Sequence, residues 1–169
     1  SMQHRIGLNC GRMVTGNMGS EMRMNYTMMG DTVNLAARLE SSAKQYGVYN
    51  FVGENIYEAA KSEFAFRFLD FVQVKGKSIP VKVYELVSEK GEILTDNINL
   101  IKLFEEGIDH YFKQEWEIAL NKFQQSENLE DKFESRNTTP SQIYIQRCKM
   151  FINNPPGKDW DGVWKMTSK

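Results

Sequence analysis

The 169-residue sequence has few of the features that define several protein classes. It holds only two cysteines, and Cys10 and Cys148 form no metal-ligand spacing with the two histidines, His4 and His110. No apolar run approaches the roughly 20 residues that cross a bilayer, and no signal peptide is visible. The formal net charge of −1 lacks the basic excess of a nucleic-acid-binding protein. We therefore expect a cytoplasmic segment with two free thiols rather than a disulfide, and with no nucleic-acid or direct membrane contact.

The composition that is present is that of a soluble globular protein, with 41% hydrophobic, 25% charged and 12% aromatic residues. One feature departs from the average: seven of the nine methionines fall within the first 29 residues. Adaptable methionine side chains suit a contact surface, although core packing explains them equally well. Ser1-Met2 resembles an expression remnant and is followed almost at once by a strand-like run, so we interpret the sequence as part of a longer protein.

Short β-type segments alternate with helices up to a boundary near residues 89–92, and the remaining pattern is helical. Strands are predicted at 5–10, 13–16, 49–52, 66–75 and 81–87. Helices are predicted at 31–46, 54–61, 97–111, 114–128 and 141–152. Gly11-Arg12 is a candidate turn between the first two strands, and residues 76–80 suit a hairpin connection. The predicted fold class is α+β, with one domain at 3–88 and a helical segment at 97–169.

The clearest helix is the one at 31–46, which Gly30 precedes and Gly47 ends, with Asp31 predicted as its N-cap. At 100° per residue, an apolar stripe of Ala36, Leu39, Ala43 and Tyr46 is expected to face the core. Asn34 and Arg38 lie together on roughly the opposite side. An amide beside a guanidinium suits a sugar hydroxyl beside a phosphate.

The helical segment carries the spacing of a tetratricopeptide helix pair, in which a small residue lets two antiparallel helices approach. The positions are Leu103, Gly107, Ala119 and Phe123. One repeat cannot bury its own apolar face, so we expect the segment to pack on the first domain or on a second chain. The aromatic-rich residues 159–164 are expected to lie against a surface.

The run Gly30-Asp31-Thr32-Val33-Asn34-Leu35-Ala36-Ala37-Arg38-Leu39-Glu40 resembles the catalytic helix of class III nucleotide cyclases, the adenylate and guanylate cyclases. The resemblance includes residues 6–11, 14–19, 74–77 and 80–86, and it spans about 5–87. It implies the C-terminal part of a ferredoxin-like cyclase domain of bacterial type, followed by the tetratricopeptide-like tail.

The resemblance implies a role for four residues in substrate binding and catalysis. Asn34 matches the asparagine that orients the ribose, and Arg38 matches the arginine that stabilises charge developing on the α-phosphoryl group. Lys75, with Lys77 as second candidate, matches the lysine that contacts the triphosphate. Thr27 occupies the position that helps to choose the base, where a hydroxyl that accepts from the adenine amino group favours ATP over GTP.

The resemblance also implies groups that this sequence does not supply. Class III cyclases hold two Mg²⁺ or Mn²⁺ ions with two aspartates from the first half of the domain, before the matched segment. We therefore expect an adenylate cyclase of intracellular signalling that makes cyclic AMP, with this chain alone inactive and without metal ligands. The family's shared sites imply a homodimer. The alternatives are a guanylate cyclase and a catalytically inert module for dimerisation or docking.

Overall fold

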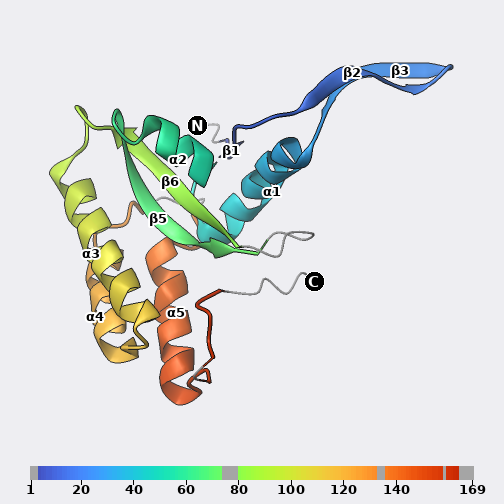
Figure 1. Ribbon diagram of the computed structural model, residues 1–169. Coiled ribbons are helices and arrows are strands. Elements are labelled where there is room, and N and C mark those ends of the chain that lie inside the picture. Colours follow the sequence, from blue (N-terminus) through green and yellow to red (C-terminus); the bar gives the residue numbers. More distant parts are fainter. Residues whose placement is uncertain (1–3, 74–79, 133–135, 158, 164–169) are drawn as a thin grey trace.

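The computed structural model describes residues 4–73, 80–132, 136–157 and 159–163 (Figure 1). The described strands are β1 (Ile6–Leu8), β2 (Val14–Ser20), β3 (Arg23–Met29), β4 (Asn50–Gly53), β5 (Phe64–Val72) and β6 (Val81–Glu89). The described helices are α1 (Asp31–Tyr46), α2 (Glu54–Ala60), α3 (Thr95–Phe112), α4 (Trp116–Glu127) and α5 (Pro140–Asn153). The α+β class predicted from the sequence is confirmed.

Four of the strands form one sheet in the order β1-β4-β6-β5, in which β1 runs parallel to β4 and the other pairs are antiparallel. Because neighbouring residues of a strand point to opposite faces, Phe51 and Val52 enter different cores. Phe51 joins the core beneath α1, and Val52 joins the core beneath α2. Each face of the sheet is therefore covered by a helix.

The parallel pair requires α1 to cross from β1 to β4, and a glycine sets how closely α1 lies on the sheet. A Cβ atom at Gly7 would stand 2.3 Å from the backbone nitrogen of Glu40 and 2.4 Å from the carbonyl oxygen of Ala36. Only a residue without a side chain therefore fits between β1 and the backbone of α1.

The prediction of a helix at 31–46 is confirmed, with two corrections in detail. Gly30 is the N-cap and no side chain caps the helix, so Asp31 is the first helical residue, where its carboxylate favours the positive end of the helix dipole. The buried stripe contains Leu35 with Leu39, Ala43 and Tyr46, while Ala36 is half-buried. The larger leucine takes the core position beside the predicted alanine.

The predicted turn at Gly11-Arg12 is wrong, because β1 pairs with β4 and does not fold back on the next strand. Instead β2 pairs with β3, a strand that the sequence pattern did not predict, and Glu21 and Met22 form the turn between them. This hairpin, which we call the arm, extends away from the sheet and the helices (Figure 1). Every residue of β3 is exposed, so its sequence shows no alternation between a buried and an exposed face.

Helices α3, α4 and α5 share one aromatic-rich core beside β5. A Cβ atom at Gly107 would lie 2.7 Å from the Phe123 ring, so the close approach of α3 and α4 predicted at this glycine is present. The Tyr144 hydroxyl donates to the Leu69 carbonyl oxygen of β5 at 2.7 Å, and the Trp160 indole packs on the ring of Tyr111. The helical segment thus packs on the sheet of the same chain. Its likeness to a tetratricopeptide repeat and the domain limits stay predictions.

The state of the two cysteines agrees with the expectation of free thiols. Cys10 is exposed and Cys148 is buried, and both are free. Burial raises the pKa of the Cys148 thiol to about 12. Within the residues that the structure describes, no helix has the length and apolar character to cross a membrane.

Candidate functional site

The exposed side of α1 carries the two polar residues that the sequence pattern placed together. Asn34 and Arg38 are both exposed, whereas Leu35 and Leu39 between and beside them are buried. Residues four apart on a helix are neighbours on its surface, about 5–6 Å apart at Cβ. The structure therefore presents an amide and a guanidinium side by side on one outward face.

Sequence patterns do not predict the contacts that hold the first turn of α1. The backbone N–H of Asn34 donates to the Gly30 carbonyl oxygen at 3.1 Å, which closes the first helical turn. The Asn9 side-chain amide donates to the Thr32 carbonyl oxygen at 3.2 Å, and that of Asn55 donates to the Cys10 carbonyl oxygen at 3.1 Å. The Asn9 amide thus ties the segment after β1 to the first turn of α1, and Asn55 of α2 contacts the same segment.

Thr27 lies on the arm, on β3, and not on α1. Its partner across the hairpin is Gly16 of β2, and cross-strand partners share one face. Gly16 has no side chain, and no other heavy atom lies within 4 Å of the place where its Cβ would stand. The space across the hairpin from Thr27 is therefore empty. The other face of the arm carries Met24, Tyr26 and Met28. Sequence reasoning did not identify Gly16 as a neighbour of Thr27, since the strand pairing was unknown.

Lys75 and its alternative Lys77 lie outside the described residues. No group of three or more histidine, cysteine, aspartate or glutamate side chains in the described part of the chain is placed to hold a metal ion. The residues present therefore do not fit the two-metal centre that the resemblance implies. The expectation that its aspartates come from elsewhere stays a prediction.

Asn34 and Arg38 are exposed on α1, and a cavity of about 860 Å³ lies elsewhere, between β5, β6, α2 and α3. That cavity is lined by the stacked rings of Tyr57 and Tyr84, whose centroids are 4.1 Å apart. Burial raises the pKa of Tyr84 to about 12.

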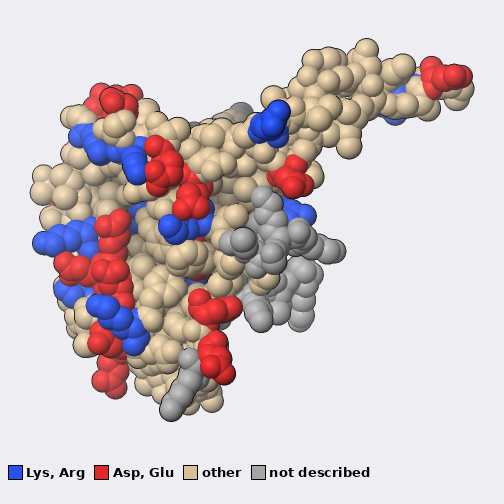
Figure 2. Space-filling view, in the orientation of Figure 1, with Lys and Arg blue, Asp and Glu red and all other residues tan. Residues whose placement is uncertain are grey.

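Figure 2 shows that the visible face of the arm carries few charged side chains except at its tip. Thr27 therefore lies on a mostly uncharged extension.

Comparisons with known proteins agree with the resemblance. A family model described as "Adenylate and Guanylate cyclase catalytic domain" matches residues 1–88. The terminal-differentiation-specific adenylate cyclase of Dictyostelium discoideum is 34% identical over 152 residues, which cover 88% of this chain and 7% of that protein. The similarity thus continues beyond residue 88 into the helices. Adenylate cyclase 1 of Rhizobium meliloti is 39% identical over 83 residues, covering 49% of this chain and 12% of that protein.

Among solved structures, the adenylyl cyclase CyaB from P. aeruginosa is 33% identical with a TM-score of 0.45, covering 53% of this chain and 45% of that chain. The chain thus spans only a small part of the length of the two curated relatives. The family model, however, matches more than half of the 169 residues. This chain therefore belongs to the adenylate and guanylate cyclase catalytic domain family.

Proposed function

We propose that this chain supplies the catalytic helix of an adenylate cyclase, a lyase that converts ATP into 3′,5′-cyclic AMP and pyrophosphate. The observation that carries the proposal is the outward face of α1, where Asn34 and Arg38 are exposed one turn apart. A solvated helix face needs no particular residue types. An amide beside a guanidinium, in a chain of this family, matches the ribose and phosphate groups of a nucleotide.

Each residue has a distinct task in the proposed reaction. The ribose 3′-hydroxyl oxygen attacks the α-phosphorus, the bond to the leaving pyrophosphate breaks, and negative charge builds on the phosphoryl oxygens. Arg38 stabilises that charge, and losing one such contact costs about 3–4 kcal/mol of barrier. Asn34 donates to or accepts from the ribose and thereby orients the attacking hydroxyl. Lys75 binds the triphosphate in the same proposal.

Two further parts of the proposal concern what completes the site. In this proposal the two metal-binding aspartates come from the upstream half of the catalytic domain, and the chain alone is inactive until they are present. We also propose a homodimer in which the arm contacts a second copy. The arm supports this because Met24, Tyr26 and Met28 are 63%, 73% and 53% exposed on one face.

The test is a nucleotide assay on a chain extended by the upstream half of the catalytic domain, with ATP and GTP compared in Mn²⁺. We expect cyclic AMP from the extended chain and none from residues 1–169. Arg38→Ala lowers kcat by about 10²–10³. Lys44→Ala is the matched control, because Lys44 is an exposed cation on a different face of the same helix.

Two results of this assay contradict the proposal. Absence of product from either nucleotide with the extended chain favours the inert dimerisation or docking module. Full activity of the Arg38→Ala variant removes the role assigned to Arg38, whatever the nucleotide.

The choice of ATP over GTP rests on Thr27, and Gly16 offers a specific test of it. A valine fits the open space at Gly16 and the strand conformation, so Gly16→Val leaves the hairpin intact while its side chain crowds Thr27. We expect the KM for ATP to rise severalfold while kcat changes little. Ser20→Val is the control, because Ser20 lies on the same face of the arm as Thr27 but pairs with Arg23, farther along the hairpin. Preference for GTP in the unmodified extended chain makes the protein a guanylate cyclase instead.

A further inference from the structure

The junction between β5 and the helical segment buries charged side chains that no feature of the exposed site requires. Arg67 and Asp70 of β5 are 1% and 0% exposed, and Arg147 of α5 is 5% exposed. Buried charges remain only where they are paired, because burial without a partner costs several kcal/mol per ion. We call this junction the seam, and it comprises the ion pairs of Arg67, Asp70, Glu130 and Arg147 with the loop residues 136–139 before α5.

One chain of contacts in the seam ends on α1. The Arg147 guanidinium donates to the Asp70 carboxylate at 2.6 Å. The hydroxyl of Tyr46, the last residue of α1, donates to the same carboxylate oxygen at 2.6 Å. Burial, and then the neighbouring Asp70 carboxylate, raise the pKa of Tyr46 far above its usual range, so this hydroxyl stays a donor. Helix α5 thus holds the final turn of α1 through one buried carboxylate.

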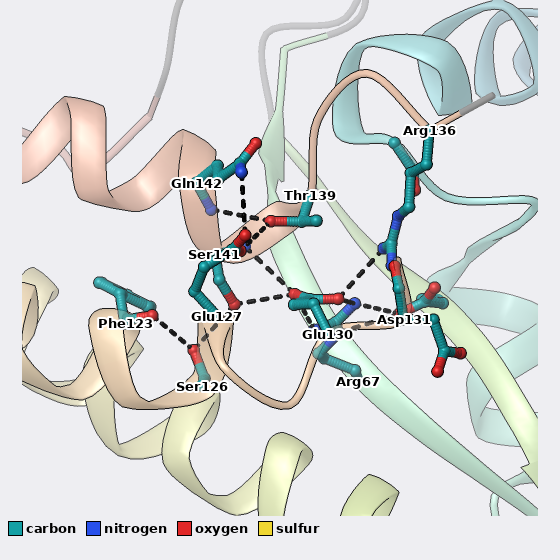
Figure 3. Close-up of polar contacts among 12 residues, drawn as sticks. Arg67, Phe123, Ser126, Glu127, Glu130, Asp131, Arg136, Thr139, Ser141 and Gln142 are labelled. Carbon is teal, nitrogen blue, oxygen red and sulfur yellow. Dashed lines mark hydrogen bonds and ion pairs between the residues drawn. The ribbon is translucent and has the colours of Figure 1, made fainter. Parts of the chain in front are cut away.

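A second chain of contacts reaches the same end of α1 from the α4–α5 loop. Arg136 donates through Nε to the carbonyl oxygen of Gly47, the C-cap of α1, at 2.8 Å. Its Nη2 donates to Glu130 at 3.1 Å, and Glu130 in turn accepts from Arg67 at 2.7 Å and from the Ser141 hydroxyl at 2.8 Å (Figure 3). The loop, β5 and α5 therefore meet on one carboxylate beside the end of α1.

The backbone at this end of α1 packs closely against the backbone of the loop before α5. Gly47 has φ +64°, the left-handed conformation that ends helices, and a Cβ atom there would stand 1.8 Å from the Thr138 carbonyl oxygen. The backbone N–H of Val48 donates to the Ala43 carbonyl oxygen at 3.1 Å. The loop before α5 thus lies directly on the turn that ends the catalytic helix.

We propose that Arg136 and Arg147 are positioning residues for the cyclase reaction. Through them the helical segment holds the C-terminal end of the catalytic helix α1 in place. The inference rests on the proposed function of Asn34 and Arg38. Its structural basis is that two groups of contacts, the partly buried ones of Arg136 and the buried ones of Arg147 with Asp70, converge on Gly47 and Tyr46. The helical segment therefore acts on the site without touching substrate.

The length of α1 explains why its far end matters for chemistry. Arg38 lies nine residues before Gly47, about 13 Å along the axis at about 1.5 Å per residue. A tilt of about 5° at the C-terminal end therefore moves Arg38 by about 1 Å, a misplacement that can cost about 10²-fold in rate. The contacts with Tyr46 and Gly47 oppose that tilt.

The first test uses the 169-residue chain and needs no activity. Hydrogen–deuterium exchange is measured for Arg136→Met, Arg147→Met and the control Phe151→Leu, a residue in the core of the helices. We expect amides at 43–48 to exchange at least tenfold faster, relative to those of β6, in both arginine variants and not in the control. Equal patterns in all three variants overturn the proposal. If an arginine variant does not fold, Tyr46→Phe removes only the hydroxyl, and a threefold increase at 43–48 is expected.

The second test measures kcat in the extended chain, corrected for folded protein. Arg147→Met is expected to lower kcat at least fivefold, but to have little further effect in an Arg38→Ala background, because both changes act on the same group. Independent, multiplying effects contradict a positioning role. If the unmodified extended chain is inactive, the proposed function fails. The exchange experiment still decides separately whether the seam holds α1.

Discussion

The arm exposes large apolar side chains, and the seam buries charged ones. The arm leaves Met22 97% and Tyr26 73% exposed, whereas the seam buries Arg67 and Asp70 almost completely. Exposed apolar side chains gain free energy when another surface covers them, and buried ions are tolerated only beside partners. The ions of the seam pair with each other within the chain. The arm has no such cover in the described residues, which leaves the two ends of α1 in very different surroundings.

The largest effect is expected from breaking the seam. Arg67→Met removes the partner of Glu85 and Glu130, which accept from Arg67 at 2.6 Å and 2.7 Å. Removing one partner of a buried ion pair costs about 3–5 kcal/mol, and Glu130 keeps its contacts with Arg136 and Ser141. Urea unfolding is the measurement.

Met22→Ser at the tip of the arm is the control for this change, with an expected effect within about 0.5 kcal/mol. Equal losses in stability from Arg67→Met and Met22→Ser would remove the energetic distinction between seam and arm.

A matched pair of glycine substitutions sharpens the comparison at smaller scale. Gly47→Ala places a Cβ against the Thr138 backbone in a left-handed conformation, with an expected loss of about 1–3 kcal/mol. Gly16→Ala enters open space in a strand and is expected to be neutral or to stabilise by up to about 1 kcal/mol. Thermal unfolding of both variants decides, and a stable Gly47→Ala variant contradicts the close packing at the seam.

Acid is expected to weaken the seam and not the arm. Burial opposes the charged form of Glu130, but the ion pairs with Arg67 and Arg136 outweigh it and hold the pKa of Glu130 below its usual range. Stability from a lowered pKa is present above the unfolded-state value near 4.5 and is lost as pH falls through the folded value. We expect the free energy of unfolding to fall below about pH 4.5, with a shallower slope in Glu130→Gln. Parallel pH profiles of the two proteins would be the contrary result.

The smallest effect on stability is expected from the arm. Replacing Met24, Tyr26 and Met28 together by serine changes exposed positions, so each contributes within about 0.5 kcal/mol to unfolding. The same change removes the apolar row of one face, and self-association in sedimentation equilibrium is expected to weaken at least tenfold. Met18→Ser with Met29→Ser alters the other face as a control. Unchanged association of the triple variant places the dimer contact elsewhere.

Sequence patterns predict those helices and strands that have one buried face and that end at a residue typical of such ends, such as glycine. Helix α1 was located because its apolar period and Gly47 coincide. The hairpin partner of β2 was missed because β3 is exposed throughout and Glu21-Met22 is not a typical turn pair. The polar pair on α1 was found from its spacing.

The seam could not be predicted, because charged residues are mostly exposed and nothing in the pattern marks Arg67 or Asp70 as buried. The pairing of Gly16 with Thr27 likewise follows only from the register of the hairpin. Predictability therefore ends where a contact joins segments that are distant in the sequence.

The distances along the chain that the seam spans have a consequence for biosynthesis. Arg136 contacts Gly47 across 89 residues, and Arg147 contacts Asp70 across 77. A ribosome that adds about 5–20 residues per second therefore completes α1 several seconds before the groups that fix its end have emerged. During that interval Asp70 lacks its ion pair with Arg147, and the part of β5 that packs on the helices is uncovered. The order of synthesis thus makes α5 the last of the described elements to join the seam, and a message truncated before Arg147 would yield a product for chaperones and proteases.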